Sequence, residues 1–166
     1  AGEQLAAEKK CAKCHGDTGV SDENDTPSIA GQIRPYTFKQ LVDYKEKFRD
    51  DSTMYKRVKD LSMKQMADLA AFYETQRIEK SIIRDTPTPP PALVTKGDLD
   101  RLLIPCADCH GRWGEGLGFE SPAIAGQKAE HFIDTMMAFK EGDRENDHFA
   151  RMRFISRILT EEEIEE

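Results

Sequence analysis

All four cysteines of this 166-residue chain lie in two copies of the pattern Cys-x-x-Cys-His. Within each copy, a single helical turn can hold the two thiols at a fixed separation, and an imidazole follows directly. This pattern is typical of covalent haem attachment, in which the thiols add to the two vinyl groups of the porphyrin and the histidine binds the iron. The sequence therefore predicts two covalently attached haem c groups. The residues that would hold them are Cys11, Cys14, His15, Cys106, Cys109 and His110.

Three other uses of paired cysteines explain the pattern less well. A structural zinc site usually combines two cysteine pairs ~12–20 residues apart, whereas about ninety residues separate the pairs here. A thioredoxin-like redox pair needs a βαβ context, which the sequence lacks. Disulfides are possible in an exported protein, but they leave the histidine after each pair unexplained.

Charge and hydropathy exclude several classes of partner. The formal net charge of −7 argues against nucleic acid and anionic membrane as partners. No apolar run approaches the ~20 residues that a bilayer-spanning helix needs. Because haem is joined to protein thiols outside the bacterial cytoplasm, we expect a periplasmic protein whose signal peptide has been removed before Ala1.

An internal repeat divides the chain into two related units. With an offset of 95 residues, the second haem motif falls on the first, and Pro122–Gln127 falls on Pro27–Gln32. A further shift of three residues brings Met152 onto Met54. Between the units lies a segment with four prolines, which favour a stiff extended connector. The predicted organisation is a first domain at 1–83, a linker at 84–95 and a second domain at 96–166.

Both units read as all-α. Helical periodicity covers 3–13 and 35–48 in the first unit, and 96–108 and 129–141 in the second, where Thr95 is the expected N-cap with Asp98 at N3. Ser62 and Thr160 each begin a capping box, which predicts a third helix in each unit. The last helix reaches only Glu166, without the apolar face of its counterpart, so we expect the natural C-terminal helix to be longer.

Met54 and Met152 are the predicted second ligands of the two haem irons. A thioether binds ferrous iron better than ferric iron and suits electron carriage. These two methionines occupy equivalent repeat positions, in polar stretches that read as loops. The other four lie at helical spacing among apolar residues, as core methionines do. His148, four residues before Met152, is the alternative ligand for the second iron, although the repeat has no counterpart to it.

Pro27 and Pro122 each follow a haem histidine by twelve residues. At that position the chain can present a backbone carbonyl to the Nδ1 proton of the histidine, which would orient the ring and make it a more electron-rich ligand. A simple turn with close approach of the backbone to the porphyrin is the alternative, and the two interpretations are compatible.

Taken together, these elements resemble the dihaem cytochromes c4. The likeness rests on two Cys-x-x-Cys-His motifs, each followed by Pro-x-Ile-Ala-Gly-Gln, a helix, a methionine and a Leu-Ser/Thr-capped helix. It covers nearly the whole chain, and the cytochrome subunit of flavocytochrome c sulfide dehydrogenase is similar too. The resemblance implies two tandem class I cytochrome c domains, with haem propionates near each other at the domain interface. It also implies His15/Met54 and His110/Met152 ligation.

The resemblance further implies an electron carrier rather than an enzyme. Its expected partners are redox proteins such as a membrane quinol-oxidising complex, a terminal oxidase or a flavoprotein dehydrogenase. Two alternatives remain: a tightly bound cytochrome subunit of a sulfide-oxidising flavoenzyme, and a haem enzyme with one open iron, such as a peroxidase.

Overall fold

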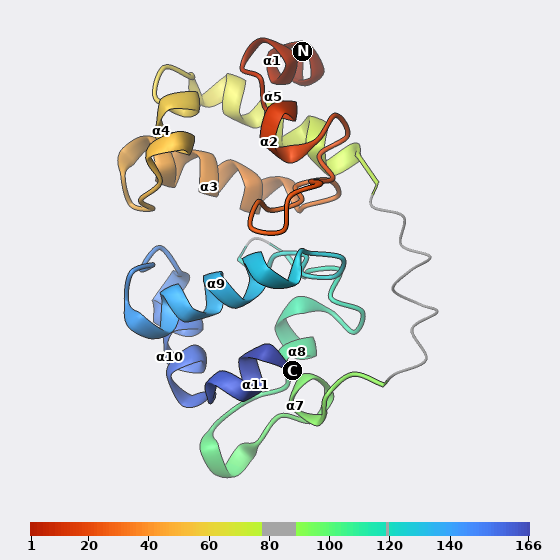
Figure 1. The fold of residues 1–166 in the computed structure, drawn as a ribbon, viewed down its shortest axis with the longest axis vertical. Coiled ribbons are helices and arrows are strands. Elements are labelled where there is room, and N and C mark those ends of the chain that lie inside the picture. The colour runs from red at the N-terminus through yellow and green to blue at the C-terminus, as the bar shows by residue number, and fades with distance from the viewer. Residues whose placement is uncertain (78–88, 119) are drawn as a thin grey trace.

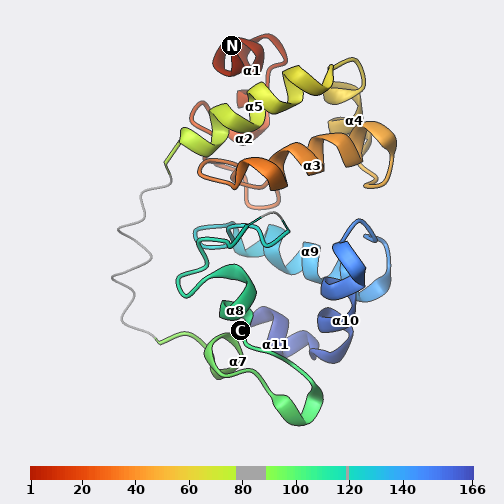
Figure 2. The ribbon, with the colours of Figure 1, turned by 180° about the vertical axis from the view of Figure 1, so that it is seen from behind.

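The structure, a computed structural model, describes residues 1–77, 89–118 and 120–166. Within these ranges the regular elements are helices, and the strand-like pairing is limited to isolated bridges. The helices form two halves, one from each repeat unit, which are stacked along the longest axis of the molecule (Figures 1 and 2). The all-α prediction is therefore confirmed.

Within residues 1–77 the first half has five helices: α1 (Gly2–Glu8), α2 (Ala12–His15), α3 (Arg34–Glu46), α4 (Ser52–Val58) and α5 (Met63–Thr75). Helix α5 lies at the centre and packs against both α1 and α3. A Cβ atom at Gly2 would lie 2.2 Å from the backbone oxygen of Asp68, so only glycine allows α1 this close to α5. Nine buried residues of this range form the core, among them Leu61 and Met66.

The second half contains α7 (Ala92–Thr95), the 3₁₀ turn η1 (Leu99–Arg101), α8 (Cys106–His110), α9 (Ala129–Glu141), the 3₁₀ turn η2 (His148–Ala150), α10 (Arg151–Ile158) and α11 (Glu161–Glu165). Helix α9 packs against α10 and α11. Among the described residues its core cluster has four buried members, Leu103, Met136, Leu159 and Ile164. This half therefore has a smaller apolar core than the first.

Two predicted helices are wrong in extent. The helix expected at 3–13 breaks after Glu8, and Lys10 takes a left-handed φ of 58° before α2 begins. The helix expected at 96–108 is replaced by a short turn and a bridge between Asp98 and Leu103. Pro105 explains part of the difference, because proline cannot donate to a helix interior. Thr95 ends α7 instead of capping a helix, and Asp98 caps η1 by accepting from the Arg101 amide.

The predicted extents of α3 and α9, and both capping boxes, agree closely with the structure. Ser62 accepts from the Gln65 amide at the start of α5, and Thr160 accepts from the Glu163 amide at the start of α11. Although α11 is mostly glutamate, Ile164 is buried in the second core.

The predicted linker needs a correction at its C-terminal end. Residues 92–95 form the helical turn α7, which packs against α8, and Leu93 joins the second core. Residues 92–95 are therefore helical and packed, and not an extended connector. The part of the predicted linker at 84–88 lies outside the described residues.

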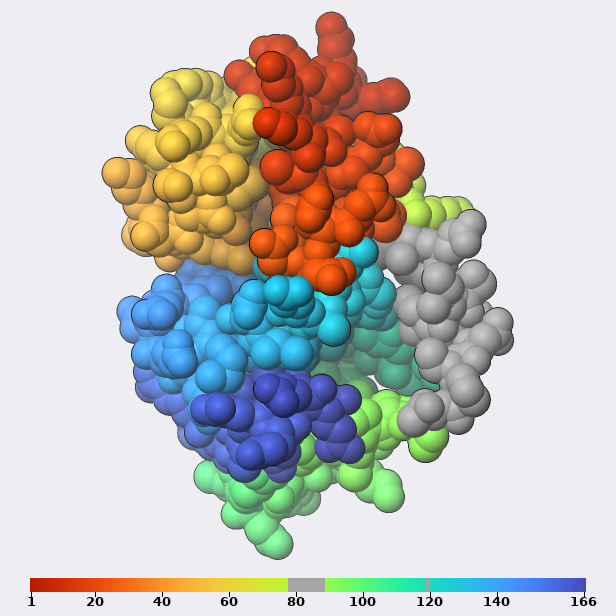
Figure 3. Space-filling model, in the orientation of Figure 1, coloured from red at the N-terminus to blue at the C-terminus, as the bar shows by residue number. Residues whose placement is uncertain are grey.

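The two halves meet face to face, with α3 of the first running alongside α9 of the second (Figures 1 and 2). In the space-filling view their surfaces touch along a seam across the molecule (Figure 3). Across the residues that the structure describes, no helix has the length and apolar character needed to cross a membrane.

Candidate functional site

The first Cys-x-x-Cys-His motif forms a single helical turn. Cys11 is the N-cap of α2, and its carbonyl accepts from the amides of Cys14 and His15 at 3.3 and 3.0 Å. The turn therefore presents both thiols and the imidazole from one short, hydrogen-bonded segment. Burial raises the pKa of the Cys11 thiol, which keeps it protonated at neutral pH.

The second motif repeats this geometry in α8. Its first turn is closed by a bond from the Asp108 amide to the Pro105 carbonyl at 3.0 Å. Burial also raises the pKa of the Cys106 thiol. Neutral thiols of this kind differ from the thiolates of redox-active cysteine pairs, which counts against the thioredoxin-like interpretation.

Neither of the other cysteine interpretations agrees with the structure. No disulfide joins any two of the four cysteines, so the disulfide alternative is not realised. In the ranges that the structure covers, no three His, Cys, Asp or Glu side chains come together as a metal site, so the cysteine pairs do not form a zinc site.

Both motif histidines are oriented by the predicted proline carbonyls. His15 Nδ1 lies 2.8 Å from the Pro27 carbonyl oxygen, and His110 Nδ1 lies 2.9 Å from that of Pro122. A carbonyl only accepts, so each ring carries its proton on Nδ1 and leaves Nε2 as the free nitrogen. Burial lowers the pKa of both histidines, although the proline carbonyls act in the opposite direction. The neutral form is the one that binds a metal.

The chain between each histidine and its proline follows the same path in both halves. The carbonyl of Gly19 accepts from the amides of Ile29 and Ala30, and the carbonyl of Gly114 accepts in the same way in the second half. Both glycines have positive φ values, 83° and 69°, which L-residues seldom adopt. These bonds return the chain to the histidine and place the proline carbonyl beside it.

The two predicted methionine ligands lie on helices, not in loops as predicted. Met54 is near the start of α4, where Asp51 caps the helix by accepting from the amides of Thr53 and Met54, both at 2.8 Å. Met152 is the second residue of α10. Both are half-buried and pack against the cores of their own halves. The Asp51 cap was a sequence signal for α4 that the prediction missed.

Packing and an electrostatic contact link the predicted haem-binding residues of the first half. Met54 and Cys11 pack against the same core cluster, and the carboxylate of Asp51, at the start of α4, acts electrostatically on His15. In the second half, the rival histidine is engaged elsewhere. His148 Nδ1 lies 3.6 Å from a carboxylate oxygen of Glu120, and its ring packs edge-to-face against Phe149.

The interface between the halves contains a symmetric pair of glutamine contacts. The side-chain amide of Gln32 accepts from the Ala123 amide and donates to the Ala123 carbonyl, both at 2.9 Å. Gln127 makes the equivalent contacts to Ser28, at 2.8 and 3.0 Å. Each glutamine ends the Pro-x-Ile-Ala-Gly-Gln segment of its own half. The repeat is visible in the sequence, whereas the groups that the glutamines bind are visible only in the structure.

A second interface cluster is built around two arginines. Arg144 donates to the Tyr36 hydroxyl and to Gln40 Oε1, both at 3.1 Å, and Arg49 donates to the same Gln40 oxygen at 2.8 Å. Asn146 Nδ2, from the second half, donates to Gln40 and Asp43 of the first half. Within the described parts of the chain, neither arginine forms an ion pair with a carboxylate. Arg49 and Arg144 are related by the repeat offset, a signal that the sequence analysis missed.

The surroundings of His131 at the interface predict that the stability of the fold depends on pH. Its amide and Nδ1 contact the carbonyls of Asn24 and Asp25 in the other half, and burial, with help from Arg49 and Arg144, lowers its pKa to about 4. In the unfolded chain it binds a proton near pH 6.5. We therefore expect stability to fall as the pH drops from 6.5 towards 4. Denaturant unfolding of the holoprotein at several pH values measures this loss.

Replacement of His131 by Gln, which keeps a donor towards Asp25, is the control. This variant should show a flatter pH dependence in the same window. If the slope of stability against pH is unchanged, His131 is not the cause of the pH dependence.

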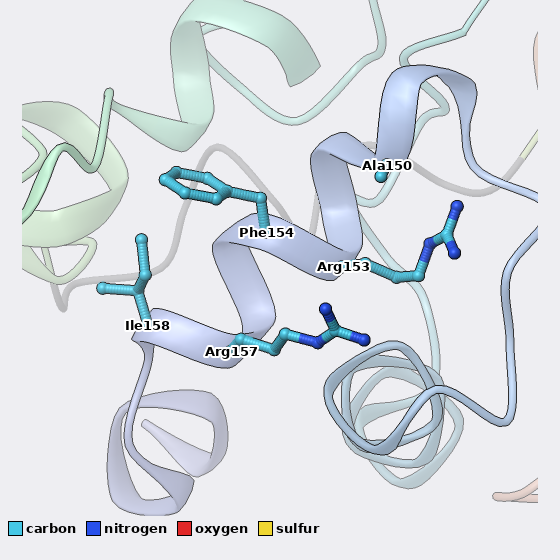
Figure 4. Close-up of a pocket in the computed structure, with 5 residues that line it drawn as sticks. All are labelled: Ala150, Arg153, Phe154, Arg157 and Ile158. Carbon is cyan, nitrogen blue, oxygen red and sulfur yellow. The ribbon is translucent and has the colours of Figure 1, made fainter.

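A surface pocket of about 340 Å³ lies along α10. Phe154 and Ile158 point to one side of the helix, while Arg153 and Arg157 point to the other (Figure 4). The residues that line it are not among the predicted haem-binding residues.

Known proteins share both the sequence pattern and the fold. A family model described as cytochrome c matches residues 1–77. A cytochrome c4 from Thiocapsa roseopersicina is 33% identical over 98% of this chain and 88% of its own length. A thiosulfate dehydrogenase electron acceptor from Thiomonas intermedia is 28% identical, covering 91% of this chain and 72% of that protein.

Among solved structures, the reduced recombinant cytochrome c4 from Pseudomonas stutzeri superposes with a TM-score of 0.85 and 27% identity. The match covers 99% of this chain and 94% of that chain. The arrangement of both halves, and not only each half alone, is therefore shared with that protein.

Proposed function

Because this chain belongs to the cytochrome c4 family and is a dihaem electron-transfer cytochrome, we propose that two His/Met pairs ligate its two irons. His15 and Met54 would bind the first iron, and His110 and Met152 the second. The two haem c groups are covalently attached, and the two halves are class I cytochrome c domains. The thioether bonds would come from Cys11 and Cys14 in one half and from Cys106 and Cys109 in the other.

One observation carries the assignment of the two histidine ligands: the free nitrogen of each motif histidine. The Pro27 and Pro122 carbonyls engage Nδ1 in both halves, so Nε2 is the only ring nitrogen left for a metal. The contact also holds the ring in one orientation and increases the electron density on the ligand. In the proposed site, Pro27 and Pro122 therefore orient the histidine ligands and increase their electron density.

The polar groups at the interface also fit haem. Haem carries two propionate carboxylates, and the interface contains two guanidinium groups, Arg49 and Arg144, without a carboxylate partner in the described ranges. Burying a cation without an anion is unfavourable. The hydroxyl of Thr37 on α3 is also buried and, among described atoms, lacks a hydrogen-bond partner. Both observations suit a site that receives a group with acceptor oxygens.

When bound, the haem groups supply the one-electron redox change, and the protein sets where and at what potential it occurs. The two Cys-x-x-Cys-His turns hold the thiols and imidazoles on short helices. A polar interface joins the two halves. We propose that the chain works in the periplasm and passes electrons between redox proteins. A quinol-oxidising membrane complex, a terminal oxidase and a flavoprotein dehydrogenase are the candidate partners.

A second function has specific support. One relative is named as the electron acceptor of a thiosulfate dehydrogenase. This chain would serve in the same way if it bound a dehydrogenase as an accepting subunit, including the flavoenzyme of a sulfide-oxidising complex. Co-purification with a dehydrogenase chain would favour this role, and elution without one would favour a free carrier.

The visible spectrum of the holoprotein tests the ligand proposal. Two His/Met irons should give a sulfur-to-iron charge-transfer band of two-haem intensity in the oxidised protein, and no binding of carbon monoxide to the reduced protein at neutral pH. A band of one-haem intensity together with carbon monoxide binding would indicate an open iron, as in a peroxidase, and would reject the assignment for that half.

A further inference from the structure

The interface glutamines contact the same peptide groups that orient the haem histidines. The peptide between Pro27 and Ser28 has its carbonyl on His15 Nδ1 and its N–H on Gln127 Oε1, at 2.8 Å in both cases. The glutamine belongs to the second half and the histidine to the first. A continuous hydrogen-bonded path therefore runs from the ligand of one haem into the other half.

The reverse path is present as well. The peptide between Pro122 and Ala123 accepts from His110 Nδ1 at 2.9 Å, and its N–H donates to Gln32 Oε1 at 2.9 Å. Each glutamine also donates its Nε2 to the carbonyl of the same residue whose amide it accepts from. Because a backbone amide only donates and a carbonyl only accepts, these contacts define the orientation of both side chains.

We propose that each half adjusts the haem ligand of the other half through these crossed peptide contacts. Gln127 is a positioning residue for His15, and Gln32 is one for His110. This inference rests on the proposed His15 and His110 ligation.

The physical basis is the resonance of the peptide bond. A hydrogen bond to the N–H of a peptide increases the negative charge on its carbonyl oxygen, because the two are conjugated, and hydrogen bonds in a chain strengthen each other. The proline carbonyl then accepts more strongly from the histidine, and the imidazole becomes a more electron-rich ligand. A more electron-rich ligand favours ferric iron and lowers the potential.

Burial makes the contacts effective. Ser28 is only 4% exposed and Gln32 only 8% exposed, so water does not compete freely for these groups. Each glutamine oxygen also accepts from its following backbone amide, Ile33 at 2.9 Å or Lys128 at 3.0 Å, which holds the side chain in place. The contact is therefore built from both halves and exists only when they are docked.

Replacement of Gln127 by Leu tests the proposal, since leucine is similar in size but forms no hydrogen bonds. The potential of the first haem should rise by about a three- to tenfold change in its reduction equilibrium, or roughly 30–60 mV at 59 mV per tenfold. The second haem should change little. Gln32→Leu should give the mirrored result. Redox titration followed through the haem-methyl NMR signals resolves the two haems.

His131→Leu is the matched control. It removes a side-chain hydrogen bond across the interface, to the Asp25 carbonyl, but none to a peptide that contacts a haem histidine. Both potentials should stay near their original values. A shift as large as that of Gln127→Leu would show that docking in general, and not the crossed contacts, sets the potentials, and would overturn the proposal.

Each remaining outcome is also informative. A Gln127→Leu shift confined to the second haem, or no shift in either, overturns the proposal. If the variant separates the halves, both contacts break at once and both potentials should rise; unchanged potentials in separated halves overturn it. A normal two-haem charge-transfer band without a crossed shift rejects the crossed contacts alone, whereas loss of that band in the unmodified protein rejects the ligand assignment.

Discussion

Replacement of Met54 by Ala should lower the potential of the first haem by roughly 100 mV or more, part of the ~0.8 V range that axial ligands span. The thioether favours ferrous iron, so its loss stabilises the ferric state. Met152→Ala should have the same effect on the second haem. In each variant the untouched haem should keep its potential, because each methionine packs within its own half. Redox titration with spectral assignment of the ligands measures both.

Met63→Ala is the matched control for Met54→Ala. Met63 is also near the start of a helix in the first half, but its side chain is 53% exposed. It should leave both potentials unchanged. If Met54→Ala and Met63→Ala behave alike, or if neither Met54→Ala nor Met152→Ala alters a potential, the methionine assignment is wrong. A response of the second haem to a His148 variant, but not to Met152→Ala, would identify His148 as the ligand.

Removing one cysteine pair should remove one haem and unfold one half. In the Cys106→Ser, Cys109→Ser variant, the intact mass should fall by about one haem. The second half should lose its cooperative unfolding transition, because among the described residues its core has four buried members against nine in the first half. Small cores of this kind depend on an internal group for stability. Mass spectrometry and thermal unfolding followed by circular dichroism measure the two effects.

The Cys11→Ser, Cys14→Ser variant is the comparison. It should lose one haem as well, but the first half should retain more residual helix, since α1, α3 and α5 pack around a larger apolar cluster. An unchanged mass in either variant would contradict covalent attachment at that pair. Greater loss of helix from the first half than from the second would contradict the role given to core size.

Local sequence patterns predicted much of this protein because their physical causes are local. A thiol pair and an imidazole within five residues define a haem-attachment turn wherever that turn lies. Capping boxes at Ser62 and Thr160 act on amides three residues away, and both are present in the structure. The proline carbonyls were also within reach of prediction, because the twelve-residue spacing recurs in both units.

The errors arose where a local turn or a core contact, and not helical periodicity, decides the backbone. Residues 96–108 have apolar residues at helical spacing, but Asp98 pairs with Leu103 and the predicted helix does not form. The Ala92–Thr95 segment follows three prolines and reads as a connector, yet Leu93 has an apolar core to join. Propensity is a weak influence that such tertiary contacts override.

From the amino-acid order alone came the two haem motifs, the duplication, the helical class and the candidate ligands, since each depends on neighbours along the chain or on an internal match between its halves. Only the folded molecule revealed that Gln127 and Gln32 reach the peptides behind the opposite histidines, and that Arg49 and Arg144 meet in one cluster. Those contacts join residues about one hundred positions apart. Their partners are chosen by how two helical surfaces dock, which no local pattern encodes.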